Sequence, residues 1–116
     1  MIDGFYAIYY TGVSGSGLGV LALHNGIIIG ADMFGGRYDG TYKQSTTPDA
    51  YDIAVRITVP PGAPLVTGAL AGPHPFYMDV TTTLPEDLGG EQPIRIETST
   101  GPVNVIFRKI RDYSIT

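Results

Sequence analysis

The residues best suited to bind metal or act as nucleophiles are few and widely separated in this sequence. The histidines are His24, beside a predicted turn, and His74, between two prolines, and neither has a second ligand at metal-binding spacing. The chain contains no cysteine, which excludes thiolate nucleophiles and thiolate metal sites. An active site would need distant residues such as Asp32 and His74 to converge. The sequence therefore predicts no metal site, no cofactor and no enzymatic activity.

A glycine cluster at residues 12–19 is the segment most similar to a phosphate-binding loop. It lacks the Lys-Ser/Thr pair of nucleotide-binding loops and the order Gly-x-Gly-x-x-Gly. No helix is predicted after it, so the helix dipole that would hold a phosphate is missing. The acidic pair Glu86/Asp87 falls in a predicted loop, where carboxylates are usually solvated. We interpret the glycine cluster as a flexible connection between two strands.

Charge and hydropathy restrict the classes of partner. The 116 residues include 7 basic and 11 acidic side chains, a formal charge of −4. Nucleic-acid binding requires a cationic surface, and the basic residues here are scattered. No apolar run is long enough to cross a membrane as a helix, and the N-terminal residues lack the basic start of a signal peptide. We therefore expect a cytoplasmic protein that binds neither nucleic acid nor membrane.

The composition and periodicity indicate an all-β domain. The chain has 16 glycines and 9 prolines, and it is rich in isoleucine, valine and threonine, which favour strands. Residues 51–59 and 76–84 alternate apolar and polar side chains, as half-buried strands do. The dipeptide Asn25-Gly26 predicts a two-residue hairpin, because both central residues of a type I′ turn need positive φ. These signals predict about eight antiparallel strands, at residues 4–11, 18–24, 27–33, 37–43, 51–59, 76–84, 93–99 and 103–110.

Short connections between successive strands favour an up-and-down meander that closes into a barrel. We expect residues 1–116 to form this single β-barrel domain. The proline-rich stretch 61–75 is the place where we expect one short helical turn.

The first strands are apolar on both faces, and tyrosine dominates the aromatic residues, with 8 Tyr and 4 Phe. Tyrosine has an apolar body and a polar tip, which suits interfaces and cavity walls. A barrel that fills its interior with one apolar face leaves the other face to a partner, most simply a second copy. The sequence therefore predicts a homodimer. The candidate residues for the dimer interface, or for an interface with another protein partner, are Tyr6, Ile8, Tyr10, Leu21, Leu23, Tyr38 and Tyr42.

Several short motifs occur in a fixed order over the first 42 residues. They are Asp3-Gly4-Phe5-Tyr6, Gly17-x-Gly19, Asn25-Gly26-x-Ile28-x-Gly30-x-Asp32 and Tyr38-x-Gly40-x-Tyr42. This series resembles the GrlR-like regulatory domain family, named for a negative regulator of a type III secretion locus. The rest of the chain resembles that family only loosely.

The resemblance implies a small lipocalin-like barrel that forms a homodimer and regulates transcription by binding a protein partner, such as a transcriptional activator. In the family an acidic run before the fifth strand is associated with that contact. This sequence has only Asp49 and Asp52 there, separated, and they are the candidates for a partner-binding loop.

An alternative hypothesis is a module that binds a small apolar ligand. An eight-stranded barrel can hold one such ligand, as lipocalin-like barrels do. The inward residues Ile53, Val55, Phe76 and Met78 would line the cavity, and the glycine-rich loop could act as a lid. The two hypotheses differ in whether the barrel interior is filled by its own side chains.

Overall fold

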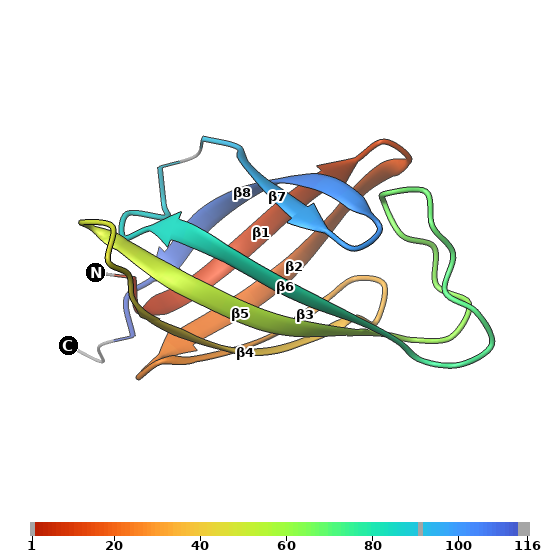
Figure 1. The fold of residues 1–116 in the computed structure, drawn as a ribbon, viewed down its shortest axis with the longest axis horizontal. Helices are drawn as coiled ribbons and strands as arrows, with labels where there is room; N and C mark the ends of the chain where they lie inside the picture. The colour runs from red at the N-terminus through yellow and green to blue at the C-terminus, as the bar shows by residue number, and fades with distance from the viewer. Residues whose placement is uncertain (1, 91, 114–116) are drawn as a thin grey trace.

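The structure, a computed structural model, describes residues 2–90 and 92–113, and these fold into the barrel shown in Figure 1. β-branched and aromatic residues at alternating positions form strands separated by glycine- and proline-containing turns, as expected. The eight strands are β1 (Gly4–Gly12), β2 (Gly15–His24), β3 (Ile27–Asp32), β4 (Arg37–Gln44), β5 (Ala50–Val59), β6 (Phe76–Pro85), β7 (Ile94–Thr98) and β8 (Gly101–Arg111).

The strands form one antiparallel sheet in the order β6-β5-β4-β3-β2-β1-β8-β7. Strands that follow one another in the chain therefore pair, apart from β6 and β7, and β1 also pairs with β8. The edge strands β6 and β7 come into contact, so that the sheet curls into a nearly closed barrel. The predicted all-β up-and-down barrel is confirmed, and most strand ends lie within a residue or two of their predicted positions.

The first two hairpins follow the turn chemistry of the sequence. Asn25 and Gly26 have φ values of 49° and 81°, as both central residues of a type I′ turn require. The flexible connection predicted for the glycine cluster at residues 12–19 is shorter than expected, because strand pairing between β1 and β2 continues to Gly12 and Gly15. Only Val13 and Ser14 remain at the tip of this hairpin.

The two ends of the barrel differ in what covers them. The terminal end carries residues 2–3, the 25–26 turn and the loop at 86–90, whereas the loop end carries the 13–14 tip, the 33–36 turn and the long segment 60–75. One main hydrophobic cluster of buried residues lies inside the barrel. It contains Ile2, Tyr6, Ile8, Leu23, Ile28, Tyr42, Ile53, Leu84, Leu88, Val105 and Phe107.

Segment 60–75, hereafter the cap loop, contains turns and one isolated bridge between Pro64 and Leu70. The predicted helical turn in 61–75 is wrong. Leu65 and Ala69 are joined by a hydrogen bond from the Leu65 N–H to the Ala69 carbonyl, which is a hairpin contact rather than a helical one. No helix in the described residues is long and apolar enough to cross a membrane.

Candidate functional site

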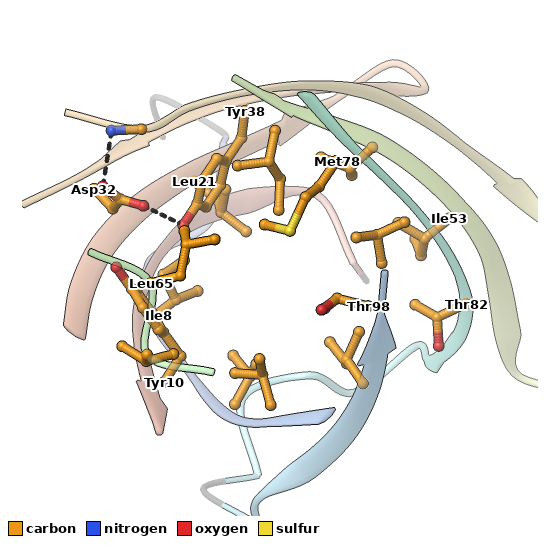
Figure 2. Close-up of a pocket in the computed structure, with 18 of the residues that line it drawn as sticks. Ile8, Tyr10, Leu21, Asp32, Tyr38, Ile53, Leu65, Met78, Thr82 and Thr98 are labelled. Atoms are coloured by element: carbon orange, nitrogen blue, oxygen red, sulfur yellow. Dashed lines mark hydrogen bonds between the residues drawn. The ribbon is translucent and has the colours of Figure 1, made fainter. Parts of the chain in front are cut away.

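The barrel interior contains a partly open cavity of about 160 Å³. It runs along the barrel interior, from Leu23, Ile28, Leu84 and Leu88 near the terminal end to the cap loop at the loop end, and its wall is mainly aliphatic. Figure 2 shows side chains from β1, β3, β4, β5, β6, β7 and the cap loop pointing into it. The apolar residues that line the cavity include Ile8, Leu21, Val55, Leu65, Met78, Val80, Val103 and Val105. The described residues that line it include no lysine, arginine or histidine.

Asp32 is the one acidic side chain among the described residues that line the cavity. It ends β3, and its Oδ1 accepts hydrogen bonds from the N–H groups of Phe34 at 3.0 Å and Gly36 at 2.9 Å. This is how an aspartate at the start of a turn satisfies the backbone beyond it. The bonds fix the carboxylate, so that Oδ2 faces the tyrosine hydroxyls of the cavity wall.

Two tyrosines complete the polar side of the wall. The Tyr38 hydroxyl donates to Asp32 Oδ2 at 2.7 Å. Tyr10 lies on the same side of the cavity as Asp32 and Tyr38 (Figure 2), near enough for the negative charge of Asp32 to act on its hydroxyl. We refer to Tyr10, Asp32 and Tyr38 as the polar cluster.

Each member of the polar cluster lies opposite a glycine on a neighbouring strand. Tyr10 pairs with Gly17, Asp32 with Gly19, and Tyr38 with Gly30. A Cβ added at Gly17 would lie 2.3 Å from the Tyr10 ring, and one at Gly30 would lie 2.3 Å from the Val20 carbonyl oxygen. Gly17 therefore provides the space that the Tyr10 ring occupies, and Gly30 lies in close contact with the backbone and side chain of β2.

Burial and the carboxylate both keep the tyrosines neutral. Burial is the largest cause that raises the pKa of Tyr38 far above its ordinary value, followed by its hydrogen bond to Asp32. Burial, followed by the negative charge of Asp32, raises the pKa of Tyr10 in the same direction. The two hydroxyls therefore keep their protons at neutral pH.

Threonines supply the other polar groups of the wall, and most of these bond to one another or to the backbone. Thr67 donates to Thr100 at 3.0 Å, and Thr98 donates to the Gly101 carbonyl at 2.6 Å. The Thr100 hydroxyl also lies 3.5 Å from Met78 Sδ. These hydroxyls tie the cap loop and β6 to the β7–β8 turn.

The cap loop closes part of the loop end. The Ser14 N–H donates to the Val66 carbonyl at 2.7 Å, and Thr67 contacts Thr100 as described above. Pro64, Leu65, Val66 and Thr67 all contribute to the cavity wall. The cap loop, rather than the glycine-rich hairpin tip alone, occupies the position expected for a lid.

The structure corrects the predicted interface residues. Tyr6, Ile8, Leu23 and Tyr42 are buried in the core, and Tyr10, Leu21 and Tyr38 line the cavity. Side chains alternate between the two faces of a strand, and the prediction selected the inward set. None of these seven residues is therefore part of an outer-face interface.

The outward neighbours of those residues form the exposed apolar surface of the molecule. Val20 and Ile29 are 54% and 56% exposed, and the cross-strand partner of each on the adjoining strand is an alanine, Ala31 and Ala22 respectively. We call this surface the apolar face; it consists of Phe5, Tyr9, Leu18, Val20, Ile27, Ile29 and Ile110.

Three of the four predicted cavity residues, Ile53, Val55 and Met78, line the cavity. Phe76 packs instead against the small cluster of Val59, Ala71 and Met78 under the cap loop. Its position at the start of β6, where the strand leaves the cap loop, explains the difference.

The acids Asp49 and Asp52 do not form a cluster. Asp49 is exposed in the turn before β5 with a φ of 56°, and Asp52 accepts a hydrogen bond from Thr83 at 3.1 Å on the outer face.

The histidines are also far from the polar cluster. His74 is exposed in the cap loop. His24, at the terminal end, stacks on Tyr113 with ring centroids 3.7 Å apart. The structure thus does not place His74 and Asp32 in one catalytic arrangement.

Sequence reasoning noted Asp32, Tyr38 and the glycines as structural motifs but did not predict the polar cluster. The sequence does contain a usable signal. An inward tyrosine or aspartate that pairs with a glycine on the adjacent strand indicates a polar group packed over that glycine. Recognising it requires the strand register, which the hairpin turn at Asn25-Gly26 fixes for β2 and β3.

The comparisons with known proteins do not identify this chain: no known protein family and no curated protein matches it. Among the described residues no group of histidine, aspartate and glutamate side chains is arranged to hold a metal ion.

Proposed function

We propose that this protein is a non-enzymatic binding protein that holds a small, largely apolar molecule inside its barrel. The observation that carries the proposal is the cavity of about 160 Å³ with its mainly aliphatic wall. An engineered apolar cavity of about 150 Å³ in another protein binds benzene. A barrel filled by its own side chains would leave no such space.

The size of the cavity sets the size of the ligand and the affinity. A molecule of about seven or eight non-hydrogen atoms fits the volume, by analogy with benzene in the engineered cavity. Burial of so few atoms gives a dissociation constant on the order of 0.1–1 mM.

Methionine methyl NMR provides the test, because Met78 lines the cavity and Met33 is exposed outside it. We expect toluene to shift the Met78 methyl signal in a saturable way and to leave the Met33 signal unchanged. The variant Val80→Phe, which fills the cavity, should abolish the shift. Thr81→Val, at the next position on the outer face, is the matched control and should behave as the wild type.

The binding test has a clear negative outcome. If Met78 does not respond to toluene in the folded wild-type protein, the cavity does not accept apolar molecules and the proposal fails. The dispersion of the amide signals shows whether each variant is folded, so that loss of binding in Val80→Phe can be separated from loss of structure.

The apolar face supports a second candidate function, a protein-interaction domain that forms a homodimer. Outward side chains on β1–β3 are aliphatic or aromatic, whereas those on β4–β6 include Arg37, Asp39, Arg56 and Asp79. Large exposed apolar patches mark interaction sites, and a second copy of this chain is the simplest partner. The resemblance to GrlR-type regulators of transcription implies the same assembly and a further protein partner.

Sedimentation velocity at tens of micromolar tests the homodimer. We expect a dimer for the wild type and a monomer for Val20→Glu, which places a charge at the centre of the apolar face. Thr81→Glu, on the polar outer face of β6, should remain dimeric. A monomeric wild type would contradict the dimer and would leave the ligand proposal unaffected.

A further inference from the structure

The middle of the cap loop is a small hairpin with hydrogen bonds of its own, and we call residues 62–72 the cap hairpin. Backbone hydrogen bonds join its two arms, from the N–H groups of Gly62, Ala71 and Leu65 to the carbonyls of Gly72, Ala63 and Ala69, at 3.0, 3.0 and 2.9 Å. Gly68, with a φ of 96°, lies in the turn between the arms. Because these bonds lie within the cap hairpin, it can move relative to the barrel without breaking them.

Proline and glycine flank the cap hairpin on both sides. Pro60 and Pro61 precede Gly62, and Pro73 follows Gly72. A Cβ added at Gly62 or at Gly72 would lie more than 4 Å from every described heavy atom outside its chain neighbours. Glycine has the widest choice of φ and ψ, whereas proline fixes its own φ. The two glycines are therefore suited to act as hinges between stiff segments.

The far end of the cap hairpin is held by contacts with two neighbouring turns. The Ser14 N–H donates to the Val66 carbonyl at 2.7 Å, and Thr67 donates to Thr100 at 3.0 Å. Gly12 allows the first contact, because a Cβ there would lie 2.4 Å from the Val66 carbonyl oxygen. Release of the cap hairpin breaks these contacts, whereas separation of two paired wall strands breaks a ladder of backbone hydrogen bonds. The cap hairpin is therefore easier to move than the strands of the wall.

The inner side of the cap hairpin is part of the cavity wall. Leu65 and Val66 both line the cavity, and Figure 2 shows Leu65 at the edge of the open space. Ala71 packs with Met78 in one buried cluster beside the Gly72 hinge, where a rotation displaces it least. A ligand contacts the inner side only when the cap hairpin is closed, so a bound ligand stabilises the closed position.

We propose that the cap hairpin is a lid that swings on its two flanking glycines to admit the ligand and is held shut by its contacts with Ser14 and Thr100. This inference rests on the proposed ligand-binding function and adds how the cavity opens and closes. The glycine-rich hairpin tip, which the sequence suggested as the lid, serves as a fixed catch, because β1 and β2 stay paired up to Gly12 and Gly15.

A disulfide across the catch tests the lid. The chain has no cysteine, so Thr67→Cys with Thr100→Cys introduces a single pair, at positions whose hydroxyls are 3.0 Å apart. Oxidised glutathione forms the disulfide, dithiothreitol reverses it, and the mass of the protein distinguishes the two states. Toluene exchange is measured from the Met78 methyl signal. We expect exchange to be at least about tenfold slower in the oxidised protein than in the same protein after reduction, with an unchanged dissociation constant, because the cross-link blocks opening and keeps the closed cavity intact.

Asp52→Cys with Thr83→Cys is the matched control. These residues pair across β5 and β6 on the outer face, with side-chain oxygens 3.1 Å apart, so the cross-link joins strands that do not move in the proposed opening. Its oxidation should leave the toluene exchange rate unchanged. An oxidised lid variant that exchanges toluene as fast as its reduced form would overturn the lid, and the ligand would then enter by another route.

Gly72→Ala tests the hinge without a cross-link. The added methyl group has free space in the closed structure, but alanine has fewer backbone conformations than glycine. We expect toluene exchange about two- to fivefold slower than in the wild type, as the lost backbone freedom allows. Gly90→Ala is the control, since an added Cβ has the same free space there but the residue lies at the terminal end, and its exchange rate should equal that of the wild type. An unchanged rate in Gly72→Ala would contradict the assignment of Gly72 as a hinge.

Amide hydrogen exchange follows the lid without any ligand. Opening exposes the Ser14 N–H to water, whereas the N–H groups of Leu65 and Ala71 stay bonded within the cap hairpin. Relative to intrinsic rates, we expect Ser14 to exchange severalfold faster than Leu65 and Ala71, and the oxidised Thr67→Cys/Thr100→Cys protein to lose this difference. If all three N–H groups exchange together in the wild type, the cap loop unfolds as a whole and the lid is overturned.

The two kinds of measurement separate this inference from the function on which it rests. If toluene does not bind the folded wild type, the ligand-binding proposal fails, and amide exchange alone still decides whether the cap hairpin opens as one body. If toluene binds but the oxidised cross-link leaves its exchange rate unchanged, the lid fails and the ligand-binding function stands.

Discussion

The two ends of this barrel are built around the same pair of residue types but differ in packing. Tyr42 donates its hydroxyl to Asp3 at the terminal end, and Tyr38 donates to Asp32 at the loop end. Both tyrosines project inward from β4. Tyr42 belongs to the buried core and does not line the cavity, whereas Tyr38 and Asp32 both line it. A tyrosine–aspartate hydrogen bond alone therefore does not indicate a binding site.

The cross-strand neighbours account for this difference. At the terminal end Tyr6 pairs with Leu21, and Tyr42 pairs with Ile53. At the loop end Tyr10 pairs with Gly17 on β2 and Tyr38 with Gly30 on β3, while the β5 partner of Tyr38, Ile57, is aliphatic like that of Tyr42. Side chains meet in pairs across a sheet, so a glycine partner leaves volume that a branched aliphatic residue would fill. Inward-facing glycines, as well as inward-facing polar groups, therefore determine where space remains inside the barrel.

Tyr6→Ala and Tyr10→Ala provide the largest test of this contrast in packing. Tyr6 is 1% exposed and its hydroxyl donates to the Ile2 carbonyl at 2.5 Å, so its truncation should reduce the free energy of unfolding by about 3–5 kcal/mol. Tyr10 already borders a cavity, and its loss should be smaller by at least about 1 kcal/mol. Urea unfolding measures both. Equal losses would show that the two ends are packed alike.

Alkaline unfolding should follow the buried tyrosines. Burial is the main cause that raises the pKa of Tyr6 to about 12, whereas an unfolded tyrosine ionises near pH 10. The folded state therefore binds more protons than the unfolded state above pH 10. Its stability is unchanged by Tyr6 below that pH and falls, by up to about 1.4 kcal/mol per pH unit, as pH rises toward 12.

Urea unfolding at a series of pH values, with tyrosinate absorbance, measures this fall. Tyr6→Phe is the control and should flatten the dependence between pH 10 and 12. Tyr10 and Tyr38 have pKa values raised in the same direction, by burial and Asp32, so the loop end should also stay protonated until the barrel opens. Ionisation of all buried tyrosines near pH 10 without unfolding would contradict both assignments.

The sequence was sufficient to predict the barrel because its signals are local. Alternation in β5 and β6 and the Asn25-Gly26 turn depend only on neighbouring residues, and these elements were predicted nearly to the residue. Which side chains of the first strands face the barrel interior could not be predicted from neighbouring residues alone. Residues 5–10 are apolar on both faces, so periodicity could not tell whether Tyr6 or Phe5 points inward.

The cavity was predicted only in outline. Ile53, Val55 and Met78 alternate clearly, and the structure places them in its wall. The polar cluster depends on contacts between β1, β3 and β4, which are separated in the chain, and on the path of the cap loop. Five prolines between residues 60 and 75 indicate an irregular segment, but they do not specify that it folds over the barrel.

Asp32→Ala and Asp3→Ala compare the two tyrosine–aspartate pairs directly. Removal of Asp32 leaves two backbone N–H groups and the Tyr38 hydroxyl without their acceptor, and we expect a loss of about 2–3 kcal/mol in the free energy of unfolding. Asp3 accepts from Tyr42 and, at 3.5 Å, from the Asn25 N–H, so its removal should cost about 1 kcal/mol. Thermal or urea unfolding of the two variants tests the order, and a reversed order would show that the terminal pair is the more important support.

The smallest expected effect on stability concerns the cap loop. Thr67→Val removes the hydrogen bond to Thr100, which together with the bond from Ser14 N–H to the Val66 carbonyl joins the cap loop to neighbouring turns. A partly exposed neutral hydrogen bond contributes about 0.5–1 kcal/mol, so the fold should persist. If the cap loop gates the cavity, exchange of toluene, measured from the line width of the Met78 methyl signal, should become severalfold faster. Thr83→Val, which removes a hydrogen bond to Asp52 on the outer face, should leave the exchange rate unchanged. An unchanged rate in Thr67→Val as well would mean that the ligand enters elsewhere, with the gap between β6 and β7 as the next route to test.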